Sequence, residues 1–235
     1  MRTLTILALV ALVGCSDRSA QSVDPRIADA SRPLVFITNP MEPPTSYTNV
    51  VGAVVGTDVD LARKIAAKMG RELVIEKVNF SDILPRLKAG TADFAIATIT
   101  ITDARRRDVD FSEPYAFGGS CFLYRSGDPK PRMSQVDTFN VGVKADTVQD
   151  FYISRHGGDP MRFQNFEEAV AALEGGDIDA IFLDEMPLRR FAEQSRGRFS
   201  ITPLETRDGY GVAVDKRRPD VLAAANAVIA EGGAK

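Results

Sequence analysis

Two polar residues end two matching segments of the sequence, and their positions suit the recognition of a small polar molecule. Thr98 follows the apolar run "FAIA", and Asp184 follows the apolar run "AIFL". Each lies five residues after a matched aspartate, Asp93 or Asp179. Ligands of open α/β sheets bind outside the carboxyl ends of the strands. We therefore expect a cleft with a hydroxyl on one wall and a carboxylate on the other.

The elements that position these residues repeat within the chain. The segments "FSDILPRLKAGTADFAIATIT" and "FEEAVAALEGGDIDAIFLDEM" share four residue types at equal spacing: Phe80/Phe166, Leu87/Leu173, Gly90/Gly176 and Asp93/Asp179. The pattern predicts a helix, a left-handed glycine cap and a buried strand. A chance recurrence in an α/β protein is the alternative explanation.

Other segments follow the same alternation of strands and helices. Residues 33–38, 72–78 and 139–144 are typical of strands, and residues 57–70 are typical of a helix with Thr57 or Asp58 near its cap and Gly70 at its end. A second helix is expected after the third strand, in "TVQDFYIS". Such alternation predicts parallel sheets, and two series with an internal echo predict two similar α/β lobes.

The composition argues against nucleic-acid binding, a disulfide framework and a metal site. The 235 residues are 44% hydrophobic and 26% charged, which suits one large globular domain or two lobes. A formal net charge of −3 gives no basic excess to hold nucleic acid. Two cysteines and one histidine predict neither a disulfide framework nor a metal site, and Cys121 in "CFLY" is typical of a core residue.

The N-terminal segment is typical of an export signal. Arg2 precedes an apolar run over residues 4–13, which is shorter than the roughly 20 residues that span a bilayer. The "LVGC" at 12–15 resembles a bacterial lipobox, so we expect a signal peptide over 1–14 and a lipid on Cys15. Residues 15–32 then form a flexible tether. An ordinary signal peptide that ends near a cysteine is the alternative.

The chain resembles the bacterial extracellular solute-binding proteins of family 3, which serve polar amino acid ABC transporters. The resemblance covers roughly residues 33–215 and rests on "GTDVDLARKIAAKMG", "ILPRLKAGTADFAIATITITDARRRDVDFSEPY", "VGVKADTVQDF" and "GGDIDAIFLDEM". It implies an α/β, two-lobed, periplasmic-binding-protein-like fold of type II, a Venus flytrap with a two-strand hinge. Lobe 1 is expected over 33–118 plus 208–235 and lobe 2 over 123–203. The hinge crossings are expected near residues 118–125 and 207–214.

The resemblance assigns roles to the two charged residues of the cleft. It implies that Arg105 binds the ligand's α-carboxylate, because a guanidinium holds a carboxylate through two hydrogen bonds. Arg105 lies three residues after Thr102, a candidate helix cap, so its side chain can turn back toward the strand end. Arg106 and Arg107 are expected to face water, which composition alone predicts for all three arginines. Asp184 is implied to bind the α-ammonium, with a helix N-cap as its alternative or additional role.

The resemblance also implies a set of neutral contacts. Thr98, Thr100 and Thr147 are expected to meet the ligand through hydroxyls and main chain, and Phe80 is expected to pack on its side chain or in the core. Asn39 stands where binders of basic amino acids carry an acid, and the nearby Glu42 is either a substitute or an exposed carboxylate. The last residues, "AEGGAK", end short of the family's usual final helix.

The expected function is capture without chemistry. The resemblance implies a monomer without cofactor, metal or nucleic acid, anchored by lipid in the periplasm or cell envelope. It would bind a free amino acid or close analogue and deliver it to an ABC transporter permease. One alternative is a sensor that presents ligand to a receptor. The other is an enzyme similar to cyclohexadienyl dehydratases, for which Glu42 and Glu185 are the candidate acids.

Overall fold

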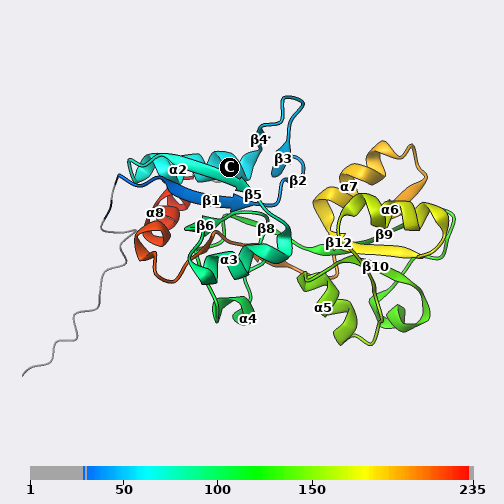
Figure 1. The fold of residues 1–235 in the computed structure, drawn as a ribbon. Coiled ribbons are helices and arrows are strands. Elements are labelled where there is room, and N and C mark those ends of the chain that lie inside the picture. The colour runs from blue at the N-terminus through cyan, green and yellow to red at the C-terminus, as the bar shows by residue number, and fades with distance from the viewer. Residues whose placement is uncertain (1–28, 30, 233–235) are drawn as a thin grey trace, which may run out of the picture.

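The chain forms two lobes, each built around its own five-stranded sheet (Figure 1). This architecture comes from a computed structural model, which describes residues 29 and 31–232. The predicted signal segment, Cys15 and most of the tether lie outside the described residues. Among the described residues, no helix has the length and apolar character needed to cross a membrane.

The first sheet has the strand order β5-β1-β6-β15-β7. Strand β1 pairs in parallel with β5 and β6, whereas β15 runs antiparallel to β6 and β7. The strands are β1 (Leu34–Thr38), β5 (Leu73–Lys77), β6 (Phe94–Ala95), β7 (Asp110–Phe111) and β15 (Ala213–Val214). The helices of this lobe are α2 (Thr57–Lys68), the 3-10 helix η1 (Phe80–Asp82), α3 (Ile83–Ala89), α4 (Asp103–Arg106) and α8 (Pro219–Ala230).

A small three-stranded sheet projects from the first lobe beside the second (Figure 1). It comprises β2 (Met41–Glu42), β3 (Ser46–Thr48) and β4 (Val54–Val55), all antiparallel. Because β2 follows directly after β1, this sheet carries Glu42 to the space between the lobes.

The second sheet has the strand order β11-β10-β12-β9-β13. Strand β10 pairs in parallel with β11 and β12, and β9 runs antiparallel to β12 and β13. The strands are β9 (Ser120–Arg125), β10 (Val141–Lys144), β11 (Met161–Phe163), β12 (Ala180–Asp184) and β13 (Phe199–Ile201). The helices are the 3-10 helix η2 (Met133–Thr138), α5 (Val148–Arg155), α6 (Phe166–Gly175) and α7 (Glu185–Gln194).

Two antiparallel strands, β8 (Ala116–Gly118) and β14 (Asp208–Tyr210), lie where the chain passes from one lobe to the other. Their close approach depends on small residues. A Cβ added to Gly119 would lie 2.1 Å from the Thr206 carbonyl oxygen, and one added to Gly118 would lie 2.6 Å from the Tyr210 hydroxyl. A larger residue at either position would force these crossing strands apart.

The predicted helix–glycine–strand repeat is confirmed. Gly90 ends α3 with φ 75°, and Gly176 ends α6 with φ 85°, so both adopt the left-handed conformation that glycine favours. The predicted parallel pairing is confirmed for β1, β5 and β6 and for β10, β11 and β12, and the chain that crosses between the lobes adds antiparallel strands to both sheets. Thr57 and Asp58 are the first two residues of α2, directly after its N-cap Gly56, as predicted. The Asp58 side chain does not cap the helix and accepts a hydrogen bond from the Tyr115 hydroxyl.

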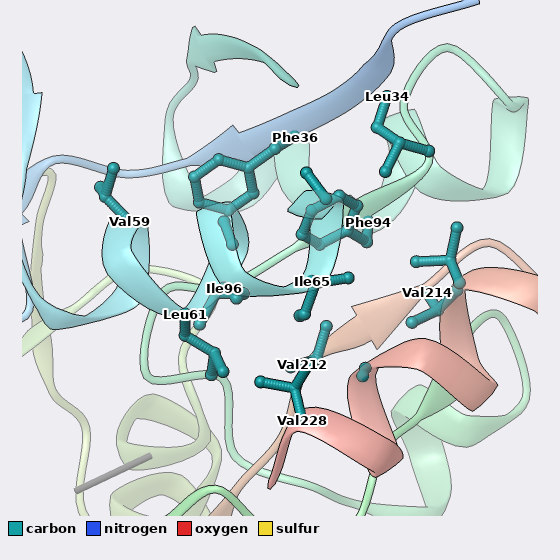
Figure 2. Close-up of a cluster of buried hydrophobic side chains, with 14 residues drawn as sticks. Leu34, Phe36, Val59, Leu61, Ile65, Phe94, Ile96, Val212, Val214 and Val228 are labelled. Atoms are coloured by element: carbon teal, nitrogen blue, oxygen red, sulfur yellow. The ribbon is translucent and has the colours of Figure 1, made fainter. Parts of the chain in front are cut away.

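Apolar clusters cover both faces of each sheet. One face of the first sheet packs against α2 and α8 (Figure 2), with Phe36 and Phe94 stacked at 5.2 Å between ring centroids. Its other face packs against α3 through Ile83 and Leu87. The second sheet is covered by α6 and α7 on one side and by α5 on the other. Cys121 is fully buried in the second sheet, as predicted for a core residue.

Candidate functional site

A small pocket lies between the two lobes and contains most of the residues that the sequence singled out. Its volume is about 20 Å³. The pocket is lined by Glu42, Phe80, Thr98, Thr100, Arg105, Lys144, Thr147, Val148, Gln149, Leu183 and Asp184.

Arg105 enters the pocket because the first turn of α4 directs it back toward the sheet. Thr102 caps this helix by accepting a hydrogen bond from the Arg105 backbone N–H, at 3.2 Å. The Arg105 Nη1 donates to the Thr100 carbonyl oxygen at 2.9 Å, which fixes the guanidinium at the end of the strand. Burial lowers the pKa of Arg105, and the charge of Asp184 acts against this shift. The neighbouring Arg106 and Arg107 are exposed, as predicted.

Asp184 faces the pocket from the end of β12. Its Oδ1 accepts hydrogen bonds from Gln149 Nε2 at 2.9 Å and from the Tyr210 hydroxyl at 2.8 Å. It occupies the N-cap position of α7 but makes no side-chain cap bond, so the carboxylate is not used to cap the helix. Burial, followed by the negative charge of Glu42, raises the pKa of Asp184 to about 7. The positive charge of Lys144 opposes this shift.

Three threonines line the pocket at element ends. Thr98 has φ 47°, a conformation that few non-glycine residues adopt, and its N–H donates to the Tyr115 hydroxyl at 3.2 Å. Its hydroxyl donates to Glu42 Oε2 at 3.0 Å. Thr147 caps α5 by accepting from the Asp150 N–H, so the N-terminus of α5 points toward the pocket. Thr100 is buried and bridges to Tyr210.

A lysine that the sequence reading did not single out crosses between the lobes. Lys144 Nζ lies 3.0 Å from Asn39 Oδ1 and 3.3 Å from Glu42 Oε1. It also lies 5.2 Å from the centroid of the Phe80 ring, and the Arg105 guanidinium lies 5.5 Å from the same ring. Phe80 is thus half-buried beside two cations, which its ring face attracts. Glu42 is paired, not exposed.

Asn39 is the predicted residue that does not line the small pocket. It borders a neighbouring cavity of about 870 Å³ and reaches the site only through Lys144. Its side-chain amide also donates to the Val78 carbonyl oxygen at 3.0 Å, which anchors it to the first lobe.

Three residues of the site that the sequence analysis did not select, Lys144, Tyr210 and Gln149, differ in how far the sequence could have indicated them. Lys144 ends the apolar strand "VGV", so the strand-end rule that selects Thr98 and Asp184 also selects Lys144 when it is applied to β10. Tyr210 and Gln149, which both donate to Asp184, had no such signal, because their contacts depend on how the crossing strands and α5 meet β12. Among the described residues, no cluster of three or more metal-ligating side chains is present.

Comparisons with known proteins identify the family of the chain. Residues 34–234 match the family model described as bacterial extracellular solute-binding proteins, family 3. The chain belongs to this family. Members that it resembles include a probable histidine-binding protein of Campylobacter jejuni, 26% identical over 88% of this chain and 82% of that protein. An L-cystine-binding protein of Escherichia coli is 28% identical over 80% of this chain and 73% of that protein.

A solved structure supports the same assignment. The arginine-bound form of truncated ArgBP from T. maritima is 32% identical, with a TM-score of 0.79 over 84% of this chain and 95% of that chain. The two-lobed fold of this family-3 solute-binding protein is therefore the one that the sequence predicted. A solute-binding role follows from membership, and the relatives are named as binding proteins rather than enzymes.

Proposed function

We propose that this solute-binding protein captures a free amino acid, or a close analogue, between its lobes and delivers it to the permease of an ABC transporter. The observation that carries the proposal is that Arg105 and Asp184 line one pocket from opposite lobes. Arg105 binds the α-carboxylate of the ligand, and Asp184 binds its α-ammonium. The named ligands of the relatives, which include histidine, L-cystine and arginine, support an amino acid.

The energetics suit reversible capture. A hydrogen bond to a charged group contributes about 1.5–3 kcal/mol, and the ligand makes several of them at once. Part of this free energy offsets the ordering of both lobes, which leaves affinity on the order of micromolar. Because the ligand bridges the lobes, it shifts the equilibrium between open and closed forms toward the closed form.

The remaining predicted residues complete the pocket in this proposal. Thr98, Thr100 and the N-terminus of α5 at Thr147 support the carboxylate site, and Phe80 packs on the ligand's side chain. Lys144 joins this set together with Asn39 and Glu42, because its ammonium lies 5.2 Å from the Phe80 ring centroid and contacts both other side chains. These three groups select the polarity of the ligand's side chain.

The cellular setting follows from the N-terminal sequence and from the relatives. We assign a signal peptide to 1–14, a lipid to Cys15 and a tether to 15–32, which places a monomer at the membrane surface in the periplasm or cell envelope. The lobes are assigned to 33–118 plus 208–235 and to 123–203. A sensor that presents ligand to a receptor would use the same pocket and differ only in its partner.

The enzymatic alternative has little support in the geometry. Glu42 accepts hydrogen bonds from Thr98 and Lys144, and Glu185 is ion-paired with Arg189. Both carboxyl groups are thus engaged by partners within the protein, whereas a general acid must be placed to donate a proton to the substrate. Incubation with prephenate or arogenate is expected to leave either compound intact.

The proposal is tested by ligand screening and one pair of variants. A thermal-shift screen over the twenty common amino acids identifies ligands, because a ligand that binds only the folded protein raises the melting temperature. Calorimetry then compares Arg105→Ala with Arg107→Ala, a neighbour whose side chain is exposed. We expect the first substitution to abolish binding and the second to leave the affinity unchanged. Equal affinity for wild type and Arg105→Ala would refute the proposed role.

A further inference from the structure

A second, much larger cavity adjoins the amino-acid pocket. Its volume is about 740 Å³, compared with about 20 Å³ for the pocket itself. Glu42, Thr98 and Asp184 line both spaces, so they form the wall between them. Pockets of roughly 300–1,000 Å³ enclose whole small molecules. A ligand held at Arg105 and Asp184 therefore has room to extend past Asp184.

The cavity lies between the first turns of α2 and α7 and is bordered by the crossing strands at Gly118 and Tyr210. Two arginines in its wall are already paired with acids of their own helices. Arg63 lies 3.3 Å from Asp60, and Arg189 is ion-paired with Glu185. Beyond these pairs, the wall contains the carboxyl groups of Glu42, Asp58 and Asp184 and one further cation, Lys64.

Asp58 has an unmet requirement for a hydrogen-bond donor. Its side chain is 1% exposed, and Oδ1 accepts from the Tyr115 hydroxyl at 3.2 Å. Oδ2 is buried and has no hydrogen-bond partner in the described part of the chain. Burial raises the pKa of Asp58 to about 7; the Tyr115 hydroxyl and the Thr98 backbone N–H oppose this shift, and the negative charge of Glu42 adds to it. A buried carboxylate without a full set of donors is costly, so this position favours a cation.

The position of the cavity indicates where on the ligand that cation is attached. Asp184 is the carboxylate proposed to hold the ligand's α-nitrogen, and the cavity begins at the same carboxylate. The side chain of the ligand, in contrast, is proposed to run toward Phe80 and Lys144, neither of which lines the cavity. An extension into the cavity therefore starts from the α-nitrogen.

We infer that the cavity is a second subsite for the amino-terminal part of a dipeptide. The terminal carboxylate stays on Arg105, the peptide N–H donates to Asp184, and the free terminal ammonium binds Asp58. A peptide N–H that donates to a carboxylate makes a charge-assisted hydrogen bond. The inference rests on the proposed function, because it takes Arg105 and Asp184 as the anchors of the C-terminal residue.

Matched ligands test the inference in the unmodified protein. The probes are the three amino acids with the largest shifts in the screen, or glutamine, histidine and arginine if none shifts, each as the free amino acid, the glycyl dipeptide and the N-acetyl derivative. The last two share the amide and differ in the terminal ammonium. We expect calorimetry to show that glycyl forms bind at least about tenfold more tightly than N-acetyl forms, the ratio for one charged hydrogen bond.

Two variants then locate the ammonium. Asp58→Asn keeps an acceptor for Tyr115 but removes the charge, and Asp60→Asn removes a charge from the rim of the same cavity. We expect Asp58→Asn to reduce the glycyl-to-acetyl affinity ratio to about one and Asp60→Asn to preserve it. The ratio cancels a general loss of affinity, and circular dichroism checks that both variants fold.

The outcomes separate this inference from the proposed function. If free amino acids bind but glycyl and N-acetyl forms bind equally, or not at all, the second subsite is refuted and the amino-acid pocket stands. A ratio that Asp58→Asn does not change also refutes the subsite. If neither amino acids nor dipeptides bind, the proposed function itself fails, and the inference fails with it. The comparison of ligands in the wild type decides even if Asp58→Asn does not fold.

Discussion

The two halves of the internal repeat build the same local structure from different surroundings. In the first, the Asp93 backbone N–H donates to the Val35 carbonyl and its Oδ2 accepts from the Val35 N–H. In the second, Asp179 makes the same two bonds with Asn140. Each aspartate thus ties the strand that follows it to the neighbouring strand of its sheet. The repeat therefore fixes the position of the strand that follows each aspartate within its sheet.

The same aspartates differ in burial. The Asp93 side chain is fully buried and is paired with the buried Arg218 and with Arg32. The Asp179 side chain is 47% exposed and lies 3.6 Å from Arg125. The first aspartate also joins a segment near the C-terminus to the first sheet, which the second has no need to do. We therefore expect Asp93 to contribute much more to the free energy of unfolding than Asp179, because the lobe that contains Asp93 is assembled from two chain segments.

The residues that face the ligand pocket have diverged further. Phe80 lies beside two cations at the cleft, whereas its counterpart Phe166 packs edge-on against Phe191 in the core. Thr98, which follows β6, and Asp184, the last residue of β12, hold equivalent places in the repeat but present a hydroxyl and a carboxylate. The two halves of the repeat therefore share the backbone structure that positions these side chains, whereas the chemical nature of the side chains differs between them.

The largest expected effect concerns the two aspartates of the repeat. Asp93→Asn leaves Arg218 buried with one carboxylate fewer, and breaking a buried ion pair costs about 3–5 kcal/mol. Asp179→Asn removes a half-exposed charge, which costs about 0–1 kcal/mol. Urea unfolding of both variants measures the difference. Equal losses of unfolding free energy would contradict this expected difference between Asp93 and Asp179.

The strand-end residues are compared by ligand binding. Asp184→Asn removes the charge proposed to hold the ammonium, so we expect an affinity loss of about 2–3 kcal/mol, on the order of 100-fold. Thr98→Val removes a neutral hydroxyl, with an expected loss of about 1 kcal/mol. Calorimetry with the best ligand of the screen measures both. A larger loss of affinity for Thr98→Val than for Asp184→Asn would contradict the role of Asp184 as the main contact of the ammonium.

Asp184 also predicts that the affinity for the ligand depends on pH. The pKa of Asp184 is raised to about 7 by burial and by Glu42, so the free protein takes up a proton there as the pH falls through 7. The ligand's ammonium requires the ionised carboxylate. We therefore expect affinity to be full above pH 7 and to fall by up to about tenfold per pH unit below it.

The control for this pH dependence is Asp184→Asn, which cannot titrate at this position. Its residual affinity is expected to change little between pH 5 and pH 8. A wild-type affinity that stays constant over this range would contradict the role of Asp184 in binding the ammonium.

The smallest effect concerns the two glycine caps. Gly90 and Gly176 have φ 75° and 85°, and an L-residue in this region costs about 1 kcal/mol. A Cβ on Gly176 meets nothing within 4 Å, whereas one on Gly90 would lie 2.5 Å from Arg217 Nη2. We expect Gly176→Ala to lose about 1 kcal/mol and Gly90→Ala slightly more, measured by thermal unfolding. A stabilised Gly176→Ala would contradict the left-handed cap.

Much of the scaffold was predictable from local patterns. Helix spacing, glycine stops and apolar strands depend on neighbours in the chain, so α2, α3, α6 and β12 could be located from the sequence. The strand-end rule then selected Thr98 and Asp184, and the resemblance to a family added Arg105. The antiparallel strands β9 and β15 were not predictable in this way, because their pairing depends on a chain that leaves one lobe and returns.

The amino-acid sequence by itself determined the local elements, the repeat and the residue types at the strand ends, because these follow from periodicity and from the conformational limits of glycine and threonine. Only the tertiary structure decided which of these side chains meet. Lys144 reaches Glu42 from the other lobe, and Tyr210 reaches Asp184 from the crossing strands. Asp58 has one oxygen without a hydrogen-bond partner among the described residues, beside a large cavity. Contacts between segments distant in the chain depend on how the two lobes pack, and this packing is encoded in no single segment.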